Sequence, residues 1–241
     1  MMKRAAEAGV GAFVTVATGP EEWQRCLDLA EGKPPVRVAL GIHPHEASCF
    51  TPEVGQELRR LSSTDSRVVA IGETGLDFFR DNSPRDKQFE AFHAQLEIST
   101  ELKKPFILHC RSAEPEMLGV LDELKKKLNA PLHGVWHCFT ATKEHAAHAV
   151  ELGLYFGLGG IITYPKAQDL RDAVATLPVD KMLLETDCPF LPPQGWRGQR
   201  NEPAYLSKVV EVLAQICKLS PEDVRCVTTE NARKLFGTWN S

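Results

Sequence analysis

The sequence predicts an α/β protein of the (β/α)8 TIM-barrel type, with the first strand missing from this chain and seven strands visible. Three observations predict this class. The length of 241 residues suits one such barrel. Short aliphatic runs alternate with longer helical patterns, as in repeated βαβ units. The centres of successive runs lie roughly 28 residues apart, which is the length of one βα repeat. We therefore expect residues 1–241 to form a single domain.

The strands are predicted from seven runs of aliphatic and β-branched residues. Several of these runs are continuously apolar, as expected for strands that are buried on both faces of a parallel sheet. The runs are residues 12–17, 36–42, 68–73, 106–110, 134–139, 155–162 and 182–187.

Helical patterns separate the strands, with clear examples at residues 88–102 and 115–128. Residues 1–8, followed by Gly9, have the pattern of a helix end with its glycine cap. A strand should precede that helix in a barrel, so we expect the chain to begin inside the first βα unit. The alternative is a seven-stranded or open variant that never had this strand.

Composition narrows the classes of protein. With 43% hydrophobic and 25% charged residues, the chain is typical of a soluble globular enzyme and not of a disordered, collagenous or coiled-coil protein. The net charge of −4 argues against a protein that coats nucleic acid in general but allows a local basic groove.

The seven cysteines are scattered without a C-x-x-C pair, which indicates reduced thiols. No apolar run reaches about 18 residues and no signal-peptide pattern begins the chain, so we expect a cytoplasmic protein.

Metal-capable side chains recur where the predicted strands end. In a TIM barrel, functional side chains gather at the carboxyl ends of the strands. A single histidine in such a position is usually structural, but repetition at five of seven runs is difficult to explain by packing. The residues are His43, His45, Glu73, His109, His137, Glu185 and Asp187.

This mixture of imidazole and carboxylate fits a divalent ion such as Mg²⁺, Mn²⁺ or Zn²⁺. Such an ion lowers the pKa of a bound water and stabilises charge on a phosphoryl or carbonyl oxygen. A cysteine-based zinc site is not expected, because Cys110 and Cys138 follow their histidines and should point to the opposite face of each strand.

Six motifs, taken together, resemble the TatD family of metal-dependent deoxyribonucleases. In chain order they are GIHPH at 41–45, IGETGLDF at 71–78, HCR at 109–111, HCFT at 137–140, ETD at 185–187 and RNEP at 200–203. The resemblance implies an amidohydrolase-like TIM barrel, dependence on a divalent metal and phosphodiester hydrolysis. It also implies that Glu73, His109, His137 and Asp187 are metal-site residues, with Glu73 and Asp187 catalytic and Asp187 the general base.

One departure from the family pattern concerns the N-terminus. Many members begin with a strand that carries a His-x-His pair, and no such pair precedes Gly11 here. The pair His43-x-His45 has the spacing but belongs to a different motif. A branch of the family lacks those first histidines, so the absent pair is compatible with activity.

Five residues are expected to bind substrate: His43, His45, Arg111, Arg200 and Asn201. The basic members would contact phosphate, and an arginine can do so with two parallel hydrogen bonds. Alternatives are that His43 supports the metal, that His45 only caps the following loop, and that Arg111 pairs with a neighbouring carboxylate.

Three further acidic residues are expected to support the site. Glu185 would orient a metal ligand from behind. Asp77 would fasten the loop after Glu73, and Glu202 would orient Arg200.

The leading functional hypothesis is a nuclease that hydrolyses DNA, and possibly RNA, as a 3′-5′ exonuclease on single strands. The same barrel could instead hydrolyse a small ester, an amide or an aminoacyl-tRNA bond, because a fold does not fix a function. A third hypothesis is an inactive, truncated barrel that only binds a partner. Strongly salt-dependent affinity for oligonucleotides would favour the nuclease, and metal titration with turnover measurements would test the inactive form.

Overall fold

The computed structural model describes residues 1–32 and 36–237. The chain forms two compact units. Unit 1 comprises Met1–Gly11 and His137–Lys234, and unit 2 comprises Ala12–Trp136 and Leu235–Ser241. All seven predicted runs contain a strand, which confirms the α/β alternation.

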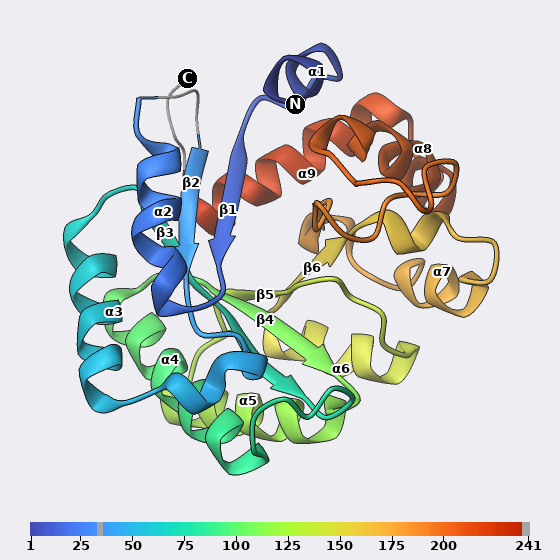
Figure 1. Ribbon diagram of the computed structural model, residues 1–241. Coiled ribbons are helices and arrows are strands. Elements are labelled where there is room, and N and C mark those ends of the chain that lie inside the picture. The colour runs from blue at the N-terminus through green and yellow to red at the C-terminus, as the bar shows by residue number, and fades with distance from the viewer. Residues whose placement is uncertain (33–35, 238–241) are drawn as a thin grey trace. The chain divides into compact units, whose positions relative to one another are not determined.

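Unit 2 holds five strands that pair in chain order, each parallel to the next. They are β1 (Phe13–Ala17), β2 (Val36–Leu40), β3 (Val68–Asp77), β4 (Phe106–Arg111) and β5 (Gly134–Trp136). The connections carry α2 (Pro20–Ala30), the 3₁₀ helix η1 (Pro44–Cys49), α3 (Pro52–Thr64), α4 (Arg85–Leu102) and α5 (Glu114–Leu128) (Figure 1). Parallel neighbours joined through helices are the βαβ units that the sequence predicts.

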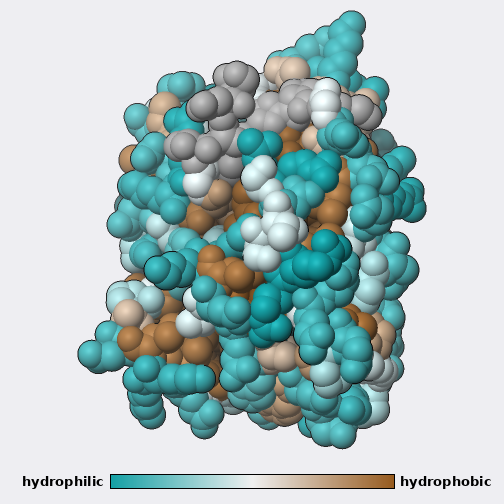
Figure 2. All heavy atoms as spheres, turned by 90° about the vertical axis from the view of Figure 1, so that its left-hand side faces the viewer, coloured by the Kyte–Doolittle hydropathy of each residue, from teal (hydrophilic) through white to brown (hydrophobic). Residues whose placement is uncertain are grey.

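Local signals set the ends of these helices. The Thr51 hydroxyl accepts a hydrogen bond from the Val54 amide at 3.3 Å and so caps α3. The left-handed residues Lys103 and Asn129 end α4 and α5. Figure 2 looks onto the face that α2 and α3 cover, and most side chains on it are hydrophilic.

The core of unit 2 lies between its sheet and these helices. Val38, Ala39 and Leu40 in β2 are 0% exposed, as expected for a strand covered on both faces. Trp23 of α2 and Phe92 of α4 are buried, and the Trp23 indole donates a hydrogen bond to the Gly41 carbonyl at 3.0 Å. The backbone that leaves β2 is thereby fixed to a helix.

Strand β3 is longer than the sequence predicts, because it continues past Glu73 to Asp77. Its register with β4 shifts between Ile71 and Thr74, which pair with Phe106 and Leu108. Three residue steps on β3 therefore face two on β4, and the extra residue forms a bulge that contains Glu73. Bulges beside functional sites redirect a side chain.

Unit 1 contains two paired parallel strands, β6 (Tyr155–Leu158) and β7 (Met182–Leu184). The longer helices are α6 (Lys143–Leu152), α7 (Gln168–Val174), α8 (Leu206–Cys217) and α9 (Pro221–Phe236). Short elements are α1 (Met2–Glu7) and the 3₁₀ helices η2 (Gly160–Thr163), η3 (Val179–Lys181) and η4 (Pro203–Tyr205). The buried Asn231 of α9 donates to the carbonyls of Val179 and Met182 at 2.9 and 2.8 Å, which fastens α9 to the start of β7.

Four strands end earlier than predicted, since β2, β5, β6 and β7 stop at Leu40, Trp136, Leu158 and Leu184. The backbone then leaves the extended conformation: Cys138 and Asp187 have φ of 48° and 54°, and η2 follows β6. As a result, residues expected within strands lie in the loops directly after them.

The N-terminal helix α1 is confirmed together with its glycine cap. Gly9 has φ 84°, its amide donates to the Ala6 carbonyl at 3.0 Å, and the Val10 amide donates to the Ala5 carbonyl at 2.9 Å. This is the Schellman pattern of a helix end. That a strand precedes this helix stays a prediction.

All seven cysteines lie in the described residues, and no disulfide joins any two of them. Within the described ranges, no helix is long and apolar enough to cross a membrane.

Candidate metal centre

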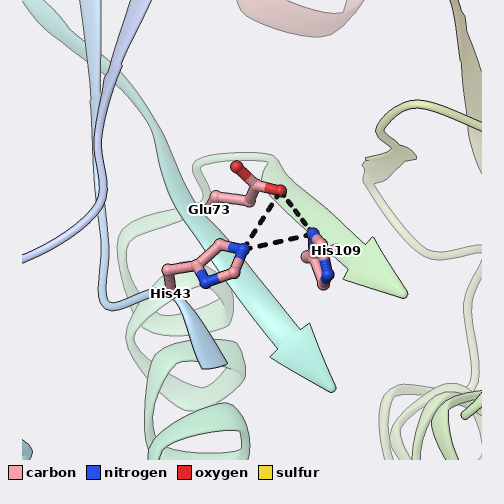
Figure 3. A group of neighbouring side chains, drawn as sticks. All are labelled: His43, Glu73 and His109. Carbon is pink, nitrogen blue, oxygen red and sulfur yellow. Dashed lines mark hydrogen bonds and ion pairs between the residues drawn. The ribbon is translucent and has the colours of Figure 1, made fainter. Parts of the chain in front are cut away.

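Three side chains of unit 2 converge, each from a different β-strand or the turn after it. His43 follows β2, Glu73 lies at the bulge of β3, and His109 lies in β4 (Figure 3). The Nδ1 atom of His109 lies 2.8 Å from Glu73 Oε1 and 3.2 Å from His43 Nε2. His43 Nε2 lies 3.8 Å from Glu73 Oε1.

The three separations, 2.8, 3.2 and 3.8 Å, bracket the spacing of ligand atoms on one divalent ion. Metal bonds of about 2.0–2.2 Å to nitrogen and oxygen place neighbouring ligand atoms roughly 3.0–3.5 Å apart. Burial lowers the pKa of His43 to about 3, although the negative charge of Glu73 opposes the shift. His43 is therefore a neutral imidazole at physiological pH, the form that ligates metals. The donor set fits Mg²⁺, Mn²⁺ or Zn²⁺, and its chemistry does not select among them.

Asp77 holds this cluster from behind. Its Oδ2 atom accepts hydrogen bonds from His109 Nε2 at 3.2 Å and from His45 Nε2 at 2.7 Å. Its Oδ1 atom accepts from the amides of Phe79 and Arg80 at 3.0 and 2.8 Å. The expectation that Asp77 fastens the loop after Glu73 is thus confirmed. A carboxylate behind a histidine fixes the tautomer and ring orientation that a metal ligand needs.

Asp77 remains ionised within this network. Its side chain is 1% exposed, and burial alone would raise its pKa. Hydrogen bonds from His109, the Arg80 backbone and His45 outweigh burial and hold the pKa of Asp77 well below its usual range. Burial would lower the pKa of His109, but its hydrogen bonds with Asp77 and Glu73 and the negative charges of these two carboxylates raise it above its usual value.

The two histidines of the GIHPH motif do different things. The His45 amide donates to His43 Nδ1 at 3.1 Å, which leaves His43 Nε2 directed at Glu73 and His109. The His45 ring instead contacts Asp77. Contact with phosphate and support of the metal both stay predictions for His43.

Two buried glutamines of α4 were not anticipated from the sequence. Gln95 accepts from the Ile42 amide at 2.7 Å and donates to Thr74 Oγ1 at 2.7 Å. Gln88 accepts from the Asp77 amide at 2.8 Å. Both are 0% exposed and lie seven residues apart, which puts them on one helix face. Two glutamines seven residues apart on the buried face of a helix are a pattern in the sequence from which these contacts could have been predicted.

Gly75 allows β3 to approach His109 closely. A Cβ atom at Gly75 would lie 2.0 Å from the His109 carbonyl oxygen, and the residue has φ +138°. Both conditions require glycine.

Unit 1 holds a second group at the ends of its strands. His137 Nδ1 lies 2.8 Å from Glu185 Oε2, and His137 Nε2 lies 3.6 Å from Asp187 Oδ1. Glu185 Oε1 also accepts from the Cys138 amide at 2.7 Å. Glu185 thus orients His137, as expected. Gly157 leaves space for this carboxylate, since a Cβ there would lie 1.9 Å from Glu185 Oε2.

The loop that carries Asp187 is fastened by Asn201. The Asn201 amide donates to the carbonyls of Thr186 and Phe190, both at 2.7 Å, and the residue is 2% exposed. Asp187 itself has the left-handed φ of 54°, a conformation that non-glycine residues adopt mainly where surrounding structure enforces it. Asn201, expected to bind substrate, therefore lies beneath the loop and positions it.

The two arginines that are expected to bind substrate, Arg111 and Arg200, are exposed. The Arg111 guanidinium lies 3.9 Å from the ring centre of Phe79. Arg200 is exposed in its loop, and its charge helps to lower the pKa of Glu202, although the described residues show no ion pair between the two side chains. Glu202 instead pairs with Arg4 through two bonds of 2.6 and 2.9 Å, and Arg4 comes from α1.

Neither of the cysteines next to the histidines joins a cluster. Burial raises the pKa of the Cys110 thiol, which disfavours the thiolate that a metal would require. In the described ranges, His43, Glu73 and His109 are the only three metal-capable side chains whose ligand atoms all lie within 4.8 Å of one another.

Comparisons with known proteins agree with this geometry. The family profile described as TatD related DNase matches residues 1–237. YabD of Bacillus subtilis, described as an uncharacterized metal-dependent hydrolase, is 35% identical, and the match covers 98% of this chain and 91% of that protein. TatD of Erwinia tasmaniensis, named a 3′-5′ ssDNA/RNA exonuclease, is 38% identical, with 98% and 92% covered.

A solved structure supports the same assignment. The crystal structure of YJJV, a TatD homologue from Escherichia coli, matches with a TM-score of 0.91 and 34% identity, covering 98% of this chain and 90% of that one. This match and the seven parallel strands confirm the predicted TIM-barrel-like α/β class. Fold and site together define a metal-dependent hydrolase. The chain belongs to the TatD family.

The role of Asp77 can be tested in EDTA-treated protein with Asp77→Asn. A carboxylate whose pKa is depressed on folding stabilises the protein above its unfolded pKa of about 3.9, and this stabilisation is lost as pH falls. We expect the variant to be destabilised by roughly 1–3 kcal/mol at pH 7, the cost of unpaired buried partners. The difference should narrow below about pH 4. Urea melts between pH 7 and pH 3 measure it.

Asp81→Asn is the control, because the Asp81 side chain is 55% exposed and its contact with Arg85 spans 3.8 Å. A destabilisation of Asp77→Asn that does not change with pH would contradict the ionised network.

Proposed function

We propose that this protein is a metal-dependent nuclease that removes nucleotides from the 3′ end of single-stranded DNA, with RNA as a second substrate. The observation that carries the proposal is the convergence of His43, Glu73 and His109 in front of the buried Asp77 carboxylate. The name of the Erwinia tasmaniensis relative supports the substrate class, whereas the name of the Bacillus subtilis relative supports only hydrolysis.

Glu73, His109, His137 and Asp187 are the proposed metal ligands, and His43 is added to them on its contacts with Glu73 and His109. A divalent ion supplies an activated water and stabilises negative charge on the phosphoryl oxygens. Asp77 and Glu185 hold His109 and His137, respectively, in the orientation for ligation.

Asp187 is the proposed general base. Its side chain is 32% exposed, so the attacking water can reach it. Asn201 holds the loop that carries Asp187 in place. Asp187 accepts the proton of the attacking water as the water oxygen bonds to phosphorus. The bond from phosphorus to the 3′ oxygen of the preceding nucleotide breaks, and that oxygen leaves and takes a proton from solvent water. The exposed guanidinium groups of Arg111 and Arg200 neutralise phosphate charge and position the strand.

Metal removal tests the proposal as a whole. EDTA-treated protein should not shorten a 5′-labelled single-stranded oligonucleotide, and added Mg²⁺, Mn²⁺ or Zn²⁺ should restore the ladder of shorter products. His109→Ala should abolish turnover and weaken metal affinity roughly 10- to 100-fold, since it removes one ligand. Gel assays and calorimetric metal titration measure the two effects.

His93→Ala serves as the matched control, because His93 is exposed on α4. Full turnover of the EDTA-treated protein without added metal would refute metal dependence. Turnover of a small ester but of no oligonucleotide would refute the nuclease.

The base is tested separately by Asp187→Asn. This variant should keep its fold and most of its oligonucleotide affinity, and its turnover should fall roughly 10²- to 10⁴-fold, the usual effect of losing a general base. Single-turnover rates and binding titrations measure this. Asp169→Asn, an exposed acid in the first turn of α7, is the control. An undiminished rate with metal still bound would assign the proton to another group.

A further inference from the structure

An exposed aromatic side chain lies beside the metal-capable cluster of unit 2. Phe79 follows the end of β3 by two residues and is 59% exposed. The Arg111 guanidinium lies 3.9 Å from its ring centre, and that of Arg80 lies 5.8 Å from it. More than half of the Phe79 surface is therefore open to solvent, next to two guanidinium groups.

The two arginines are not committed to acidic partners. Among the described residues, no carboxylate lies within ion-pair distance of Arg80 or Arg111, so the pairing considered for Arg111 from the sequence does not occur. Arg85, which covers the neighbouring Phe78 at 4.1 Å, does approach Asp81 at 3.8 Å. Two uncompensated positive charges thus flank one exposed ring in a protein of net charge −4.

Hydrogen bonds fix the backbone of this ring relative to the metal-capable cluster. Asp77 accepts from the Phe79 and Arg80 amides with one oxygen and from His109 with the other. The Phe78 amide donates to the Arg111 carbonyl at 2.9 Å, which ties the ends of β3 and β4 together. The Phe79 backbone and the proposed metal ligand His109 are therefore held by the same buried carboxylate.

We propose that Phe79, with Arg80 and Arg111, is a stacking platform for one nucleobase of a single-stranded nucleic acid. This rests on the proposed nuclease function and names how its substrate is held. Aromatic rings stack on any base, and guanidinium groups add cation–π and phosphate contacts. Such a platform binds single strands without regard to sequence, because every base has a π-face. A duplex would present its bases already stacked and could not use it.

The first test measures oligonucleotide affinity by fluorescence anisotropy with EDTA-treated protein, so that no hydrolysis interferes. Phe79→Ala and Phe79→Leu should each raise Kd about fivefold or more, the loss expected for one stacked base. Phe79→Trp should restore the affinity. Arg111→Gln should reduce the slope of log Kd against log salt by about one phosphate contact. Leu29→Ala, a change at another exposed apolar residue, 50% exposed on α2, is the matched control.

The second test removes the base instead of the ring. Single abasic sites are placed at each of the last four nucleotides from the 3′ end. With wild-type protein, one of these positions should raise Kd about as much as Phe79→Ala does. With Phe79→Ala protein, the same abasic site should raise Kd little further, because the ring on which that base would stack is already absent.

The outcomes separate this platform from the nuclease itself. Equal Kd for wild-type and Phe79→Leu proteins, while wild type shortens the oligonucleotide, overturns the platform alone. An abasic penalty that persists in full in Phe79→Ala protein also overturns it. Failure of wild type to shorten the oligonucleotide with any of the three metals overturns the proposed function, whatever the Kd values are.

Discussion

The buried carboxylate of Asp77 is the interaction on which the arrangement in unit 2 depends. One oxygen receives the ring nitrogens of His109 and His45, and the other receives two amides of the following loop. An ionised carboxylate that is 1% exposed is costly unless hydrogen bonds satisfy it, and these four contacts do so. The same contacts leave His109 Nδ1 directed at Glu73.

The surrounding backbone is shaped to allow this network. The bulge in β3 presents Glu73 toward the histidines, and glycine at position 75 lets β4 approach. Gln88 and Gln95 of α4 clamp the strand and turn that carry Asp77 and His43. Unit 1 repeats the principle, because Glu185 orients His137 and Gly157 leaves space for that carboxylate. In both units a histidine is aimed by an acidic residue behind it, as metal ligands commonly are.

Much of the fold was predictable because parallel strands buried on both faces are continuously apolar, and all seven runs contain a strand. Their ends were not, since they depend on single residues with positive φ, such as Cys138 and Asp187, that hydrophobic pattern does not reveal. The role of His43 stayed open, because its contact with Glu73 depends on how the bulge redirects that side chain. Gln95 was missed because a glutamine on an amphipathic helix resembles a solvent-facing residue until its partners are known.

The central claim is that His43, Glu73 and His109 together hold a divalent ion. Diffraction from crystals grown with Mn²⁺, recorded where manganese scatters anomalously, tests it most directly. We expect an anomalous peak about 2.0–2.3 Å from His43 Nε2, His109 Nδ1 and a Glu73 oxygen, the usual length of such bonds. Crystals in which manganese binds elsewhere, with no peak within bonding distance of these three atoms, would contradict it.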